Sequence, residues 1–206
     1  VMEQLLLLNP ELPVVVYIEL MKGEYGRAEA FLHDVLAFMS RKKMLLPFLA
    51  RTFAYGIEIA QNMHYWFRSN SIIPGGLKFL FKCESVRSFL GLLLHDLLGK
   101  VTSIADNTLE LDPSRAPEGH DVQWSVPHIQ ILLADIAQKI QNSMDHLPLP
   151  LVYVCQVLQR EAMRKNGDYL ASLDVVSSAV FLRLIIPAIV SPSVFGLLSK
   201  EEQTPR

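Results

Sequence analysis

HIQILLADIAQKIQNSM, residues 128–144, is the stretch that decides the fold class of this chain. Its apolar side chains recur at intervals of three and four residues, which places them on one face of an α-helix. We expect the helix to begin here because Pro127 precedes it and Ser125 is a candidate cap. The apolar stripe consists of Ile129, Leu132, Leu133, Ile136, Ala137 and Ile140.

The same spacing recurs on both sides of this stretch. Helices are predicted over 28–39 and 86–98, whereas "VVVYI", residues 14–18, is ambiguous between helix and strand. The polar stretch 106–124 is predicted to be a loop, and two prolines, Pro148 and Pro150, separate two further helices. Alternating strand patterns are scarce. The predicted fold class is therefore all-α, with a single helical domain over 1–206.

The composition of the chain limits the classes of function that fit it. The chain has 206 residues, of which 50% are hydrophobic, and a net charge of −2, which argues against a nucleic-acid partner. Cys83 and Cys155 form no metal or disulfide pattern, so we expect a cytoplasmic location. The longest apolar run, 175–190, contains Arg183 and Pro187 and is expected to be too short and too interrupted for a transmembrane segment.

Several kinds of site are also disfavoured. Neighbouring His and Asp residues, such as His33-Asp34 and His95-Asp96, point in different directions on a helix and make no metal site alone. Gly75-Gly76 is the only glycine pair, and no nucleotide-binding or hydrolase motif surrounds it. We therefore expect no metal and no cofactor bound to the chain itself.

Two arginines, Arg68 and Arg183, remain as candidate functional residues. "SSAVFLRLIIPAIVSP", residues 177–192, is expected to be buried nearly all round, and a buried unpaired guanidinium would cost several kcal/mol or more. Arg183 therefore needs a definite partner. Arg68 follows the aromatic pair Trp66-Phe67 and precedes Ser69, Asn70 and Ser71, which favour turns and helix caps. Arg68 is thus predicted to lie on a loop between helices, where an isolated arginine is usually solvated.

Together, the two arginine segments resemble a known family. "FRSNS", residues 67–71, resembles the F-R-x-N-S of Ras GTPase-activating (RasGAP) domains, and "FLRLIIPA", residues 181–188, resembles their F-L-R-x-x-x-P-A signature. "ELDPSR", residues 110–115, is similar to the polar linker of the family, and the resemblance runs from about Glu11 to the end, most closely to the neurofibromin type. The signature positions are Phe181, Leu182, Arg183, Pro187 and Ala188.

The resemblance implies a function. Arg68 would be an arginine finger that is inserted in trans into a GTP-bound Ras-family small GTPase, and the chain would be an activator rather than an enzyme itself. GTP and Mg²⁺ would belong to the partner. Arg183 would hold the finger loop through its backbone carbonyls, and recruitment to the plasma membrane would come from flanking domains. The expected GTPase contacts are Trp66, Phe67, Ser69, Asn70 and Ser71.

Alternatives to this interpretation stay open. Arg183 could instead pair with Asp174 or Glu161. "IIPGG", residues 72–76, departs from the family, and two glycines at a helix start cost about 2 kcal/mol against alanine, so we expect the helix to begin near Leu77 and the finger loop to be looser. That departure favours a second function, a helical module that binds without activating.

Two further features concern the ends of the chain and its signature. Ile186 stands where neurofibromin-type domains often have asparagine, so any bond that this asparagine makes is absent. The chain opens on Val1 and ends on "SKEEQTPR", whereas the family continues with a further helix. We therefore expect an incomplete domain with an uncovered apolar strip, less stable and weaker in binding than an extended one.

Overall fold

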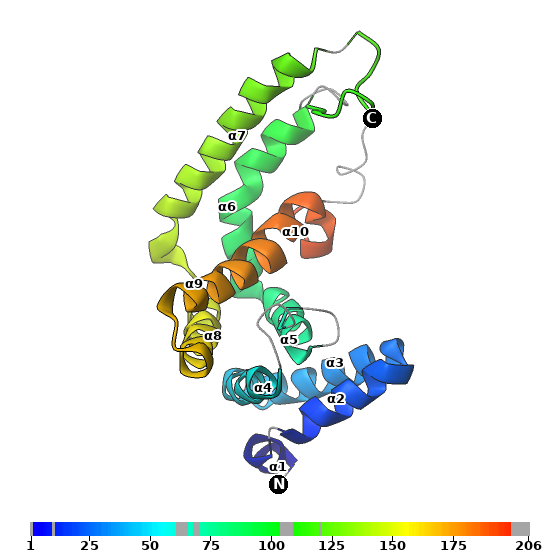
Figure 1. Ribbon diagram of the computed structural model, residues 1–206, viewed down its shortest axis with the longest axis vertical. Coiled ribbons are helices and arrows are strands. Elements are labelled where there is room, and N and C mark those ends of the chain that lie inside the picture. The colour runs from blue at the N-terminus through cyan, green and yellow to red at the C-terminus, as the bar shows by residue number, and fades with distance from the viewer. Residues whose placement is uncertain are drawn as a thin grey trace. The chain divides into compact units, whose positions relative to one another are not determined.

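The computed structural model describes residues 2–9, 11–60, 66–67, 71–103, 109–119 and 121–198. Within this part every regular element is a helix, which confirms the all-α fold class (Figure 1). The elements are α1 (Met2–Leu8), α2 (Glu11–Gly23), α3 (Tyr25–Arg41), α4 (Leu45–Ile59), α5 (Ile72–Phe81), α6 (Glu84–Ser103), α7 (Val122–Asn142), η2 (Met144–His146), α8 (Leu149–Asn166), α9 (Tyr169–Ser177), η3 (Ser178–Ile185), α10 (Ile186–Val190) and η4 (Pro192–Phe195).

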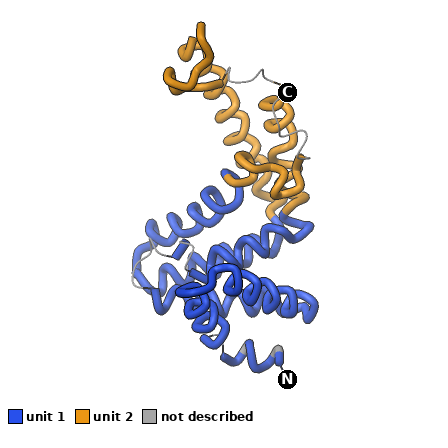
Figure 2. The backbone as a smooth tube through the Cα atoms, turned by 90° about the vertical axis from the view of Figure 1, so that its right-hand side faces the viewer, with its two compact units in different colours: residues 1–86, 148–186 blue, residues 87–147, 187–206 orange. Residues whose placement is uncertain are grey.

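The chain forms two compact units (Figure 2). Unit 1 comprises residues 1–86 and 148–186, and unit 2 comprises residues 87–147 and 187–206. The chain therefore leaves unit 1 within α6 and returns to it before α8. Whether 1–206 behaves as one domain stays a prediction.

Unit 1 contains the elements that flank Arg68 and carry Arg183. In this unit α4 packs against α8, α3 packs against α5, and η3 packs against both α9 and α5. Its core is large and apolar, because amphipathic helices bury their apolar faces against one another. Fully buried members include Leu36, Met39, Phe48, Phe53, Leu77 and Leu80.

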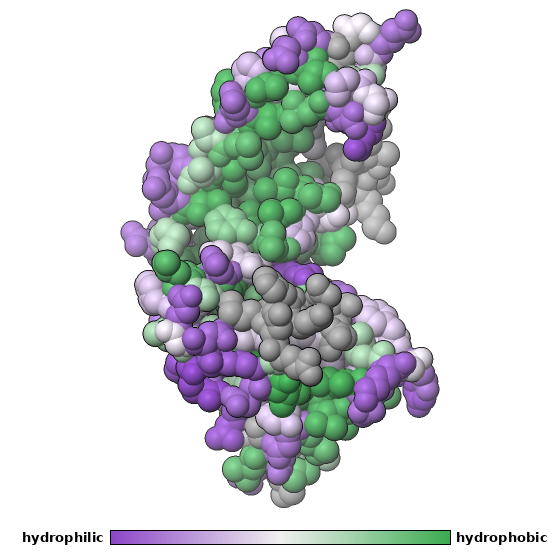
Figure 3. Space-filling view, viewed as in Figure 1, coloured by the Kyte–Doolittle hydropathy of each residue, from purple (hydrophilic) through white to green (hydrophobic). Residues whose placement is uncertain are grey.

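Unit 2 contains most of α6 and all of α7. Two ion pairs join these helices, Lys100 with Asp135 and Lys139 with Asp96. Apolar side chains gather over this part of the chain in the view of Figure 3. Large side chains such as Leu92 and Ile131 are exposed there. Exposed apolar surface of this kind is typical of contact surfaces.

The structure assigns one ambiguous run to a helix and moves one helix boundary from its expected position. The ambiguous run 14–18 lies in α2, with Val14 and Tyr17 buried. α7 begins at Val122, before Pro127, because the Asp121 carboxylate caps it by accepting a hydrogen bond from the Gln123 amide at 2.9 Å. Pro127 is therefore inside the helix, where it removes one backbone hydrogen bond.

The predicted stripes of the other helices were mostly correct. The stripes in 28–39 and 86–98 lie on the inner faces of α3 and α6, where Val86 and Leu90 are fully buried. In α7 the stripe is only partly right: Ile136 is buried, whereas Leu133 is 61% exposed. The periodicity thus predicted the helix better than it predicted which side of it is covered.

The segment around Arg183 forms one continuous helical stretch, Tyr169–Val190, of 22 residues. Of the described helices, this one is long and apolar enough to cross a membrane, by length and composition only. It is longer than the apolar run 175–190, and the expectation that no segment here spans a membrane stays a prediction. In unit 1, its first part, α9, packs against α8.

Candidate functional site

The candidate site is built around the connection between α4 and α5, which carries the predicted finger Arg68. α4 ends at Ile59, Ala60 follows in an extended conformation, and Trp66 and Phe67 form a turn. Arg68, Ser69 and Asn70 lie outside the residues that the structure describes. The site is therefore defined by the elements that hold the two sides of this connection.

Trp66 is the internal anchor of the connection. Its side chain is fully buried, with 0% of its surface exposed. Its indole Nε1 has no hydrogen-bond partner within the part of the chain that the structure describes. Phe67 is half-buried. The burial of Trp66 makes it a residue that fixes the backbone before Arg68, and a direct contact with a GTPase would require its ring to move out of the core.

Ser71 closes the connection by capping α5. Its hydroxyl accepts a hydrogen bond from the amide of Ile73 at 3.4 Å, as expected for an N-cap residue. α5 begins directly at Ile72, so the expectation of a later start near Leu77 is wrong. The proline in this stretch, Pro74, is tolerated because the first turn of a helix has no intrahelical partner for its amide.

The two glycines of α5 are explained by close packing. A Cβ atom on Gly76 would lie 2.6 Å from the Phe53 ring and 2.9 Å from Leu49 of α4. A Cβ atom on Gly75 would lie 2.3 Å from a methyl group of Leu32 in α3. The cost of glycine in a helix is thus offset by an approach to α3 and α4 that a larger residue would prevent.

Arg183 binds the backbone just before the predicted finger. Its guanidinium Nη2 donates a hydrogen bond to the carbonyl oxygen of Phe67. The expected contact with a main-chain oxygen between Trp66 and Ser71 is therefore present. Neither alternative partner forms an ion pair with it among the described residues: Glu161 binds Arg160 and Arg164 instead, and no ion pair joins Asp174 to Arg183.

The surroundings of Arg183 differ from the expectation of an all-round burial. Arg183 itself is exposed, and Leu182 and Ile186 are 59% and 45% exposed. Leu184, Ile185 and Ala188 are buried, so the segment covers the core with one face only. The guanidinium is therefore held by a specific hydrogen bond while water still reaches it.

The backbone that presents Arg183 is wound as a π-helix over Ser178–Ile185. A π-helix is rare and is frequent at functional sites, because the wider turn changes which side chains share a face. Here Phe181, Leu182 and Arg183 are exposed in succession. No feature of the sequence predicted this winding.

A second cation, Lys165 near the end of α8, lies at the other side of the connection. Its ammonium donates hydrogen bonds to the carbonyl oxygens of Ile57 at 2.5 Å and Glu58 at 2.9 Å, and to that of Ala60. Sequence reasoning missed Lys165, because a lysine near the end of a helix is usually solvated.

Arg164, the neighbour of Lys165, strengthens the same junction. It binds the Glu58 carboxylate, and its Nε donates to Glu161 at 2.9 Å. The hydrogen bond from Arg164, together with its charge, holds the pKa of Glu58 below its ordinary value. The pKa of Arg164 is raised, chiefly by its hydrogen bonds to Glu161 and Glu58.

The described residues offer cations and backbone oxygens rather than a metal centre or a nucleophile. No group of three or more metal-ligating side chains occurs among them. Burial raises the pKa of the Cys155 thiol to about 11, which disfavours the reactive thiolate. The cations that the described part of this site presents are Arg164, Lys165 and Arg183.

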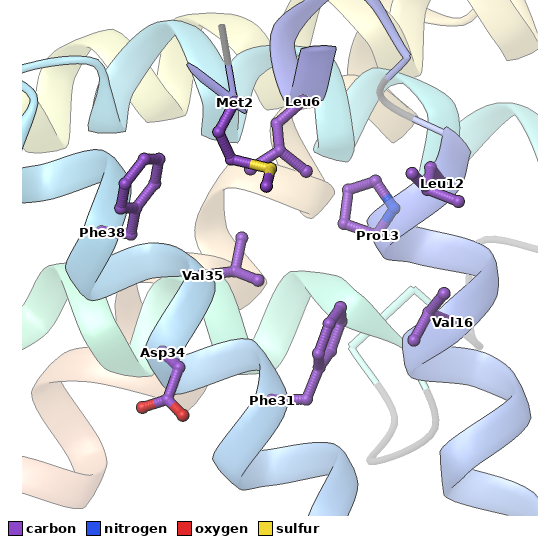
Figure 4. Close-up of a pocket in the computed structure, with 9 residues that line it drawn as sticks. All are labelled: Met2, Leu6, Leu12, Pro13, Val16, Phe31, Asp34, Val35 and Phe38. Carbon is purple, nitrogen blue, oxygen red and sulfur yellow. The ribbon is translucent and has the colours of Figure 1, made fainter. Parts of the chain in front are cut away.

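An apolar pocket of about 380 Å³ lies among the N-terminal helices (Figure 4). Phe31, Val35 and Phe38 of α3 line it opposite residues of α1 and α2, while the Asp34 carboxylate points away from them. None of the lining residues belongs to α4, α5, α8 or η3, which form the candidate site.

Residues 118–206 match the family model RasGAP, described as GTPase-activator protein for Ras-like GTPase. Human Ras GTPase-activating protein 1 is 32% identical over 108 residues, 51% of this chain and 10% of that protein. Ras GTPase-activating protein gap-2 of Caenorhabditis elegans is 28% identical over 171 residues, 81% of this chain and 14% of that protein.

A third relative extends the similarity over nearly the whole chain. Ras GTPase-activating protein 2 of Rattus norvegicus is 25% identical over 201 residues, which is 95% of this chain and 23% of that protein. The chain thus spans from about a tenth to about a quarter of the length of these relatives. The similarity includes the Arg183 segment, which lies inside the matched family region.

Proposed function

We propose that this chain, whose residues 118–206 match the RasGAP family model of activators of Ras-like GTPases, accelerates GTP hydrolysis by a Ras-family small GTPase. It acts on the GTP-bound form and supplies one catalytic group in trans. GTP and Mg²⁺ belong to the partner, and the chain contributes no cofactor. It works in the cytoplasm, with recruitment to the plasma membrane by flanking domains.

The catalytic group in this proposal is the Arg68 guanidinium. Charge that builds up on the transferred phosphoryl group is stabilised by a permanently charged group that donates several hydrogen bonds at once. Arginine fingers in GTPase systems contribute about 10³–10⁵-fold in rate. Phe67, Ser69, Asn70 and Ser71 adjoin the finger and are the proposed contacts to the GTPase, whereas Trp66 anchors the backbone.

One observation carries the proposal more than any other. Arg183 of the signature motif binds the carbonyl oxygen of Phe67, the residue immediately before Arg68. A finger must be held in place before it reaches its target, because a misplaced charge stabilises the transition state poorly. A guanidinium bound to the adjacent carbonyl restrains the backbone at the position where this matters.

The proposal is tested by single-turnover GTP hydrolysis with a Ras-family GTPase and variants of Arg68. Arg68→Ala is expected to lower the saturating rate by at least about 10³-fold while the thermal midpoint stays unchanged. Arg68→Lys should restore little, because an ammonium lacks the planar fork of donors. The matched control is Arg27→Ala, an exposed arginine that pairs with Glu24. Equal rates for Arg68→Ala and the unchanged chain would refute the finger.

The second candidate function is a helical module that binds the GTPase without activating it. The "IIPGG" stretch favoured it because a loose finger loop was expected there. α5 forms over this stretch and packs tightly, which removes the argument from a late helix start, while the looseness of the finger loop stays a prediction. The same assay separates the two functions, since the module would bind a GTP-loaded GTPase and leave its hydrolysis rate unchanged.

A further inference from the structure

The end of α4 lacks a cap of its own. Its last turn contains no basic residue, and Ala60 at the C-cap is in the extended region instead of the left-handed one that closes many helices. The last carbonyl groups of a helix have no intrahelical partner and carry partial negative charge. They therefore need a donor from elsewhere, and the direction in which the chain leaves α4 depends on that donor.

Lys165 of α8 supplies this donor. Its ammonium has three hydrogens, and it contacts three carbonyl oxygens, those of Ile57, Glu58 and Ala60. These residues lie more than a hundred positions before Lys165 in the sequence. A single ammonium thus closes the C-terminus of α4 and also fixes Ala60, the first residue of the connection that leads to Arg68.

The packing around Lys165 holds the ammonium in place. α8 packs along α4, so the stem of the lysine starts from a fixed position. Arg164 beside it binds Glu58 on α4 and Glu161 on its own helix, and Glu161 is only 7% exposed. α8 then ends at Gly167, whose positive φ of 67° closes the helix, and Asp168 caps α9.

Two cations, one from α8 and one from η3, therefore bind the backbone at two points that precede Arg68. Lys165 binds Ala60 at the start of the connection, and Arg183 binds Phe67 directly before Arg68. We infer that Lys165 is a second positioning residue for the arginine finger, acting through the end of α4 on the backbone that carries Arg68. This inference rests on the proposed function, and Lys165 itself touches neither nucleotide nor GTPase.

The test uses the full chain with Lys165→Met, which keeps the length of the side chain and removes its donors. Saturating single-turnover hydrolysis should fall at least tenfold, whereas the concentration of chain that gives half the maximal rate should change less than threefold. Lys165→Arg, which keeps a cation, should recover most of the rate. The control is Lys100→Met, which removes a lysine that pairs with a carboxylate, Asp135, and should keep the rate.

A double-variant cycle with Arg68→Ala separates positioning from general destabilisation. If Lys165 acts through Arg68, Lys165→Met should leave the residual rate of the Arg68→Ala chain unchanged. An equal fractional loss in both backgrounds would overturn the inference, as would an unchanged rate for Lys165→Met alone. If the unchanged chain fails to accelerate hydrolysis, or if Arg68→Ala is fully active, the proposed function fails instead.

Hydrogen exchange gives a readout that does not depend on GTPase activation. Amides in a peptide that covers residues 57–67 should exchange at least tenfold faster in Lys165→Met than in the unchanged chain, and at the unchanged rate in Lys100→Met. This also covers the case in which Lys165→Met folds poorly, because Lys165→Arg should restore slow exchange. Equal exchange in this peptide for Lys165→Met and the unchanged chain would show that the ammonium does not hold the end of α4.

Discussion

Arg183 combines an exposed guanidinium with a hydrogen bond to the Phe67 carbonyl. At the scale of the residue, this predicts that replacing Arg183 lowers the rate of GTP hydrolysis more than it lowers the stability of the fold. Arg183→Ala should lower the saturating rate of GTP hydrolysis at least tenfold, because the backbone before Arg68 loses its restraint. The free energy of unfolding should fall by only about 1 kcal/mol, since water can replace part of the lost bond.

Single-turnover assays and thermal unfolding of the same preparations measure both effects. Arg27→Ala is again the control, because it removes an exposed arginine that pairs with a neighbouring glutamate. A large loss of stability with an unchanged saturating rate would contradict the support role of Arg183.

Glu58 carries a prediction on pH. The hydrogen bond and charge of Arg164 hold its pKa below the ordinary value of 4.5. A carboxyl whose pKa is lowered by folding stabilises the fold above its ordinary pKa, and this contribution disappears as the pH falls through the folded pKa. Glu58→Gln should therefore have a lower thermal midpoint than the unchanged chain at neutral pH, and the difference should close as the pH falls below about 4.

Thermal unfolding from about pH 7 to about pH 3 measures this difference. The exposed Glu118, which lies outside these helices, provides the control variant Glu118→Gln. A difference between Glu58→Gln and the unchanged chain that stays constant over this range would argue against the Arg164 contact.

At the scale of the element, the glycines of α5 are explained by close packing, although glycine has a low helix propensity. Gly76→Ala should destabilise the chain by about 1–3 kcal/mol, because the new methyl group would lie 2.6 Å from the buried ring of Phe53. Gly91→Ala is the matched control, since a Cβ atom in that helix meets no other atom within 4 Å. The control should be neutral or stabilise by up to about 1 kcal/mol.

Chemical denaturation of the two alanine variants measures the contrast. Stabilisation by both substitutions would mean that α5 has room for side chains at Gly76, and that the glycine is retained for another reason. Gly75 is the weaker case, because the nearest atom is a methyl group of the flexible Leu32 side chain.

At the scale of the whole molecule, the proposed function predicts a nucleotide-dependent partner. A Ras-family GTPase that is loaded with a non-hydrolysable GTP analogue should raise the thermal midpoint of the chain, because ligands that bind only the folded state stabilise it. At a free partner concentration a hundred times the Kd, the gain is about 2.7 kcal/mol. The same GTPase with GDP should give a much smaller shift, and equal shifts with both nucleotides would contradict selective binding of the GTP-bound form.

Much of the architecture could be predicted from periodicity, and the errors share one cause. The stripes of α3 and α6 were predicted with their buried faces, because repeated apolar spacing is a local property of the sequence. The start of α5, the reach of α7 past Pro127 and the exposed Leu133 were predicted wrongly, because each depends on what packs against the helix. Propensity rules contain no information about that neighbour.

The residues of the candidate site show the same difference between what the local sequence predicts and what packing decides. The sequence by itself determined the all-α class, the two arginine motifs and the need of Arg183 for a definite partner, while the family resemblance implied a backbone oxygen near Trp66. Only the tertiary structure decided that Phe67 provides that oxygen, that Ser178–Ile185 is a π-helix, and that Lys165 closes α4. The physical reason is sequence distance, because Arg183 and Phe67 are 116 positions apart and Lys165 and Ile57 are 108 apart. Bonds between such residues exist only once packed helices bring them together.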